Sequence, residues 1–130
     1  MTPQQPWSDA EAALALDNVR RACRELPEVT EKLSHGAPTF FVTKSVVMFQ
    51  EDHHGDGRLA IWCAAASGVQ EVMVESEPDR FFVPPYVGHR GWLGARLDVD
   101  VDWDEIAAVI EAAYRCVAPP RALRQLDSER

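Results

Sequence analysis

The chain has 130 residues, of which 46% are hydrophobic, and its formal net charge is −8 at pH 7. This length and composition suffice for one folded domain with its own core and argue against a disordered protein. The acidic balance argues against a surface that binds nucleic acid over its whole extent, but a local basic patch stays open. We expect one domain over residues 1–130, with an N-terminal tail at 1–7 and a C-terminal tail at 119–130.

The sequence contains neither a recognisable targeting segment nor a cysteine motif. The first six residues contain no basic side chain and no apolar run, and no segment reaches the roughly 18 apolar residues of a membrane span. We therefore expect a cytoplasmic protein without a membrane partner. The cysteines are few and widely spaced, at Cys23, Cys63 and Cys116. Without a Cys-x-x-Cys pair they predict small buried side chains rather than a zinc or redox site.

An amphipathic helix is the first element expected. Ser8 and Glu11 have the spacing of a capping box, and apolar residues then recur every three or four positions up to Leu26. Pro27 ends this helix because proline cannot donate the next backbone hydrogen bond. Residues 28–32 are expected to form a turn or a short helical piece.

Three strands are expected next, over residues 39–42, 45–49 and 58–64. The loops between them are short, which favours antiparallel pairing. The second loop contains His53 and His54 among acidic residues and glycines. We interpret it as a solvated turn, because two adjacent histidines cannot easily face one metal ion.

A second helix should begin at a capping box formed by Ser67 and Gln70 and end by Pro78. A fourth strand is expected over residues 92–97, and Asp102 should cap a last amphipathic helix that runs to Val117. Because the strands are grouped rather than alternating with helices, the order predicts an α+β fold of two layers. The expected architecture is an antiparallel sheet of about four to five strands with helices packed on one face.

Strand alternation separates the two faces of this sheet. Aliphatic residues of the third and fourth strands should meet the helices, which places the other side chains on the open face. Those side chains are Arg58, Trp62, Trp92 and Arg96. Tryptophans beside arginines could stack bases or another planar group. The alternative is that cation–π pairs, loops or a partner subunit cover this face.

Two segments without acidic residues, 33–50 and 80–97, add basic and aromatic candidates. The residues predicted to bind a ligand are His35, Lys44, Arg58, Trp62, Tyr86, His89, Arg90, Trp92 and Arg96. There is no phosphate-binding loop, nucleophile elbow or metal-ligand spacing. We therefore assign no catalytic residue, no metal ligand and no cofactor, and whether the protein is an enzyme stays open.

The ordered set of residues 26–31, 35–40, the third strand, 88–93 and the closing helix resembles the MmcQ/YjbR-like family, over about Leu16 to Val117. The resemblance implies a frataxin-like α+β sandwich, also described as a double-wing fold, and a DNA-binding role through the open sheet face and a loop. The family pattern maps here on Gly36, Pro38, Gly88, His89, Arg90, Trp92 and Arg96. DNA is the partner this implies. The alternative is a module that binds a small ligand or a protein, without nucleic acid binding or catalysis.

Overall fold

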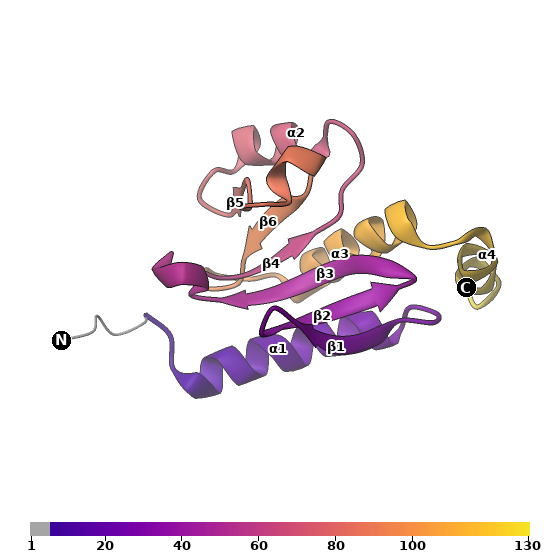
Figure 1. Cartoon of the computed structure of the whole chain (residues 1–130), viewed down its shortest axis with the longest axis horizontal. Helices are drawn as coiled ribbons and strands as arrows, with labels where there is room; N and C mark the ends of the chain where they lie inside the picture. Colours follow the sequence, from indigo (N-terminus) through magenta and orange to yellow (C-terminus); the bar gives the residue numbers. More distant parts are fainter. Residues whose placement is uncertain (1–5) are drawn as a thin grey trace.

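The computed structural model describes residues 6–130 and contains four α-helices, two short 3-10 helices and one sheet in that range (Figure 1). The helices are α1 (Asp9–Arg24), α2 (Val69–Ser76), α3 (Trp103–Val117) and α4 (Pro120–Ser128), with the 3-10 helices η1 (His53–Gly55) and η2 (Gly88–Arg90). The strands are β1 (Thr30–Ser34), β2 (Ala37–Val42), β3 (Lys44–Glu51), β4 (Leu59–Cys63), β5 (Phe81–Phe82) and β6 (Leu93–Arg96). The α+β class is confirmed.

Two of the three predicted helix caps are present. The Ser8 hydroxyl accepts a hydrogen bond from the Glu11 amide, and the Asp102 carboxylate accepts from the amides of Asp104 and Glu105. The prediction for α2 is wrong, because its N-cap is Gly68 in the left-handed conformation and no side chain bonds there. A glycine adopts that conformation without strain, so the helix begins there without a capping hydroxyl.

The sheet is antiparallel, with the order β1-β2-β3-β4-β6-β5. It has six strands, so the prediction of four to five was too low. The two missed strands are both at the edges: β1, where a turn was expected, and the two-residue β5. Four of the five β1 residues are exposed, so the strand carries no apolar alternation and is held by its pairing with β2.

The helices α1 and α3 pack together on one side of the sheet, against β3, whereas α2 lies beside β5 at the sheet edge (Figure 1). The strand register confirms which residues share a face, since Ile61 pairs with Ala95 and Cys63 with Leu93. All four are buried in the core. On the opposite face, one row of paired residues crosses the sheet from β2 to β5. Its members are Thr39, Met48, Trp62, Gly94 and Phe82.

The second face is not an open platform. Trp62 is 2% exposed and Trp92 is 4% exposed, so the expectation of exposed tryptophans is wrong and the covered alternative holds. The ring of His53 in η1 lies against Trp62, and the guanidinium of Arg90 lies 5.5 Å from the centre of the Trp92 ring. The cover comes from the turn after β3 and from residues 83–91, which have no periodic pattern that sequence reasoning could assign to a face.

The C-terminal segment also differs from the expected tail. Residues 120–128 form α4, which buries Ala122 and Leu126 completely, and Arg121 bonds the carboxylate of Glu28. Pro120 stands at the first position of this helix, where its missing N–H has no intrahelical partner to lose. Of the expected N-terminal tail, residues 1–5 lie outside the described residues, whereas Trp7 is buried and its indole N–H donates to Glu51.

Candidate ligand-binding cavity

A cavity of about 550 Å³ lies on the sheet face opposite α1 and α3. The residues that line it are Ser34, His35, Thr39, Phe41, Ser45, Met48, Gln50, His53, His54, Trp62, Tyr86 and Val87. The floor comes from β2, β3 and β4, and the walls come from the β1–β2 turn, from η1 and from the segment before η2. This volume is within the range of about 300–1,000 Å³ that small-molecule sites occupy.

Strand alternation explains the floor. Alternate residues of a strand share a face, so Met48 and Gln50 of β3 lie beside Trp62 of β4. A register shift between Phe40 and Phe41 then pairs Phe41 with Ser45 at the other end of the floor. The shift is a bulge, which bends the strand and changes where its side chains lie.

Aromatic rings meet at one end of the cavity. The His53 ring lies 4.7 Å from the Trp62 ring and 5.8 Å from the Tyr86 ring, edge to face in both cases, and 4.2 Å from the ring of His54. Edge-to-face contacts are favourable for aromatic pairs. These four rings join η1 to β4 and to the segment before η2, and therefore form one continuous aromatic wall.

Two polar atoms in this wall have no partner. In the described part of the chain, Trp62 Nε1 and His53 Nε2 are the buried side-chain nitrogens or oxygens that make no hydrogen bond. Leaving such a group unpaired costs about 1–3 kcal/mol, and natural structures contain few of them. An unpaired indole N–H next to a cavity is therefore a feature that stability alone does not favour.

The backbone around the cavity is strained as well. His35, His54 and Tyr86 have φ values of 51°, 50° and 65°, in the left-handed region that residues with a side chain seldom adopt. Each such residue costs on the order of 1 kcal/mol or more, and such residues collect at binding and catalytic sites. Three lining residues on three separate turns share this conformation.

The lining contains no aspartate, glutamate, lysine or arginine. Burial lowers the pKa of His53, the charge of His54 lowers it further, and Asp56 opposes the change. His53 is therefore kept neutral at pH 7. An adjoining hollow of about 450 Å³ shares His35, Gln50, His53 and His54 and adds the carboxylates of Glu51 and Asp52. Among residues 6–130, no three histidine, cysteine or acidic side chains converge to hold a metal ion.

The neutral state of His53 predicts a pH-dependent stability. Its pKa in the folded protein lies below the unfolded value of about 6.5, so the unfolded chain binds more protons as the pH falls. This contribution to the free energy of unfolding is complete above pH ~6.5 and is lost as the pH falls through the folded pKa. We expect urea midpoints to fall between about pH 7.5 and pH 5.5, and His53→Asn to reduce the fall. His89→Asn, at an exposed position outside the cavity lining, should leave the fall in place; an unchanged slope in His53→Asn would contradict the assignment.

The structure brings three of the nine predicted binding residues into the cavity, namely His35, Trp62 and Tyr86. The others lie elsewhere. Lys44 is exposed at the start of β3, and His89 and Arg90 are exposed in η2. Trp92 is buried next to Arg90.

Two of the predicted arginines carry acidic partners. Arg96 makes two hydrogen bonds to Asp98, of 3.0 and 2.6 Å, and these bonds raise its pKa. Arg58 lies 3.9 Å from Asp56 and stacks 4.0 Å from the centre of the Phe82 ring. Both guanidinium groups are therefore engaged within the fold.

Sequence reasoning missed most of the lining. The residues it did not select are Ser34, Thr39, Phe41, Ser45, Met48, Gln50, His53, His54 and Val87. The interpretation of His53 and His54 as part of a solvated turn is wrong for His53, which is half-buried against Trp62. The alternation of Met48, Gln50 and Trp62 was a usable signal, because all three share the face that the sequence already assigned to Trp62.

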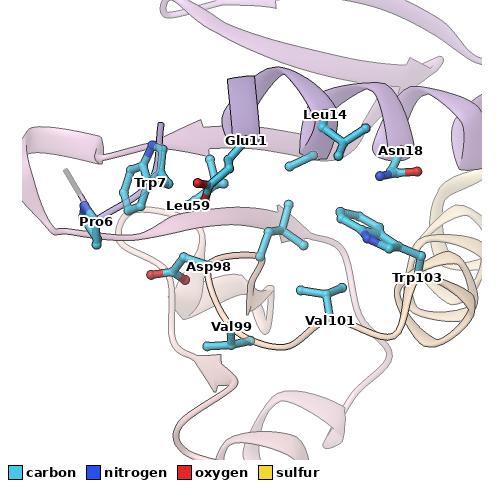
Figure 2. Close-up of a pocket in the computed structure, with 12 residues that line it drawn as sticks. Pro6, Trp7, Glu11, Leu14, Asn18, Leu59, Asp98, Val99, Val101 and Trp103 are labelled. Atoms are coloured by element: carbon cyan, nitrogen blue, oxygen red, sulfur yellow. The ribbon is translucent and has the colours of Figure 1, made fainter. Parts of the chain in front are cut away.

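A second hollow, of about 290 Å³, lies between α1 and the loop that joins β6 to α3 (Figure 2). Figure 2 shows Trp7 and Trp103 toward its two ends, with Glu11 and Leu14 of α1 across from Val99 and Val101. Asp98 in its lining binds Arg96 and the Trp7 N–H binds Glu51, and none of its lining residues has a buried, unpaired side-chain nitrogen or oxygen in the described part of the chain. This hollow therefore lacks the unpaired groups that distinguish the larger cavity.

Comparison with known proteins gives the family. The model of the YjbR family matches residues 24–116, which is most of the chain and includes all six strands. The chain belongs to the YjbR family. Among curated proteins, none matches this YjbR protein significantly.

A solved structure supports the fold of this YjbR protein. The crystal structure of protein DR2400 from Deinococcus radiodurans, which has a DUF419 domain, matches with a TM-score of 0.67 and 16% sequence identity. The match covers 86% of this chain and 87% of that protein. At this identity the likeness extends to the fold alone. Within the described residues, no helix of the YjbR protein is both long and apolar enough to cross a membrane.

Proposed function

We propose that this YjbR protein is a ligand-binding domain that holds a small organic molecule in the cavity on the second sheet face. The observation that carries the proposal is the pair of buried, unpartnered ring nitrogens, Trp62 Nε1 and His53 Nε2, in the wall of a cavity of about 550 Å³. A bound molecule would supply the partner that the fold does not. The left-handed backbone at His35, His54 and Tyr86 supports the same interpretation.

DNA binding is the second candidate. It is favoured by the exposed run of Tyr86, His89 and Arg90, and by the absence of any acidic partner of Arg90 within residues 6–130. The ion pairs of Arg58 and Arg96 argue against a continuous basic patch, as does the net charge of −8. The frataxin-like, double-wing description of the fold belongs to this second proposal.

A screen of uncharged aromatic compounds by thermal shift and ligand-observed NMR tests the first proposal. We expect several hits, each raising the melting temperature, as selective binding to the folded state requires. Ser45→Phe places a ring over the floor of the cavity and should abolish binding. The matched control is Lys44→Phe, which adds the same ring at an exposed position outside the lining and should retain binding.

The two candidates can be separated in the same experiment. Duplex DNA is added at two salt concentrations, since binding through phosphates weakens steeply with salt. If the protein binds DNA, and Arg90→Ala weakens this binding while Ser45→Phe leaves it unchanged, DNA binding becomes the favoured function. An empty screen, or hits that Ser45→Phe retains, would remove the cavity proposal.

A further inference from the structure

We infer that the ligand of this cavity is an uncharged, planar heterocycle that carries a hydrogen-bond acceptor, the chemical class to which purine bases belong. The inference rests on the proposed function, because it names the ligand of the same cavity. Three properties of the lining carry it: the absence of charge, the aromatic walls and the unpaired indole donor.

The lack of acidic, lysine or arginine side chains in the lining disfavours an ionic ligand. None of the twelve lining residues is acidic or basic beyond the three histidines, and His53 is kept neutral by burial. A charged group that enters such a cavity loses its hydration and finds no opposite charge, which costs several kcal/mol. A carboxylate, a phosphate or an ammonium group in the aromatic part of the cavity is therefore disfavoured.

The aromatic walls select a flat molecule. Rings of Phe41, Trp62 and Tyr86 line the cavity together with the imidazole of His53. A planar ring system stacks on such walls or meets them edge on, and each contact contributes about 0.5–1.5 kcal/mol beyond the burial of area. A flexible aliphatic chain gains only the burial term.

The indole donor selects an acceptor. Trp62 Nε1 can only donate a hydrogen bond, and it has no acceptor in the described protein. Nε1 is buried and the imidazole of His53 lies edge-on against the indole ring, so the inference requires that the His53 side chain turn aside to admit the acceptor. The amide of Gln50, on the same floor, offers both a donor and an acceptor to a second polar atom. A ring that carries a carbonyl next to an N–H matches this pair.

The adjoining hollow extends the match to a ring substituent. It shares Gln50 and His53 with the cavity and carries the carboxylate of Asp52, one oxygen of which accepts from the Gly57 amide. Carboxylates accept hydrogen bonds from hydroxyl or amine groups. A substituent with such donors therefore fits at the open side, while the ring itself stays in the neutral part.

The test compares hypoxanthine with indole in the whole protein. Both are uncharged fused bicycles of similar size at pH 7, but indole has only an N–H donor and offers no ring acceptor. The indole N–H resonances of ¹⁵N-labelled protein report the donor directly, and Trp62→Phe assigns the Trp62 signal among the four tryptophans. We expect hypoxanthine to bind at least about ten-fold more tightly than indole and to move the Trp62 N–H signal downfield, as a new hydrogen bond requires.

Trp62→Phe keeps a ring and removes the donor, so it should abolish the preference for hypoxanthine. If that variant does not fold, the Trp62 signal is assigned by elimination. It is the indole N–H signal that remains when each of the other three tryptophans is replaced in turn. Equal or tighter binding of indole, or binding of hypoxanthine without movement of the Trp62 signal, would overturn the inference while the proposed function stands. Failure of every compound in the aromatic screen would overturn both.

Discussion

Gly94→Ala is expected to lower the free energy of unfolding by about 1–3 kcal/mol, the usual cost of overpacking a core. A Cβ atom at this position would lie 2.5 Å from two atoms of the Phe82 ring, closer than any ordinary contact. The φ angle of Gly94 is not in the left-handed region, so the close approach of Phe82 accounts for the glycine. The Phe82 ring cannot easily move away, because it is buried and the Arg58 guanidinium stacks on it.

Chemical denaturation of Gly94→Ala, Phe82→Leu and the double variant measures this contact. If the two side chains collide, Phe82→Leu makes room for the new methyl group, so the double variant should be more stable than the sum of the single effects predicts. A coupling of about 0.5–3 kcal/mol is typical of residues in contact. Strictly additive effects would mean that the strand relaxes instead of the ring.

The stacking of the Arg58 guanidinium on the Phe82 ring explains why Arg58 is a poor candidate for binding DNA. The sequence placed it on the second face correctly, because strand alternation depends only on the backbone. It could not show that Phe82, from a two-residue strand more than twenty positions away, would lie under the guanidinium. Long-range pairing at a sheet edge leaves no local signal.

The acid-free segments also gave a wrong expectation, namely that their arginines have no acidic partners. Residues 80–97 contain no acid, but the arginines at both ends of the segment bind carboxylates that lie outside it. Arg80 binds Glu77 and Glu105, and Arg96 binds Asp98. A window of sequence counts charges along the chain, whereas the field at the surface depends on charges in space. Arg90, in the middle of the segment, is exposed and has no acidic partner within residues 6–130, as the sequence predicted.

The elements with strong local signals were predictable. The caps at Ser8 and Asp102 and the apolar stripes of α1 and α3 depend on neighbours within one or two turns, and the structure confirms them. The floor of the cavity could be predicted in part, because strand alternation selected Trp62. The walls of the cavity could not be predicted, because left-handed backbone at His35, His54 and Tyr86 is stabilised by tertiary packing rather than by residue type.

Gln70→Leu is expected to destabilise the protein by about 1–3 kcal/mol, the cost of taking a donor away from a buried acceptor. The Gln70 side chain is 7% exposed, and its amide donates to the carbonyls of Gly88 and Trp92 over 2.8 and 2.6 Å. These two bonds tie α2 to the segment that carries Tyr86 and Val87 over the cavity. Leucine has nearly the same volume but no donor, so the Trp92 carbonyl loses the Gln70 bond and the Gly88 carbonyl keeps only its bond from the Gly91 amide.

Urea denaturation and amide hydrogen exchange check this prediction together. Exchange at Arg90 and Gly91, whose amides bond within η2, should become faster because the turn loses its anchor. Gln125→Leu removes the same group from an exposed position of α4 and should change stability by less than about 0.5 kcal/mol. Unchanged exchange in η2, together with a stability equal to that of the Gln125 control, would mean that Gln70 is not what holds the cavity wall. Gln70→Leu should also lower the affinity of the cavity for every aromatic ligand. In the variant the ligand must order residues that Gln70 holds in place in the natural protein.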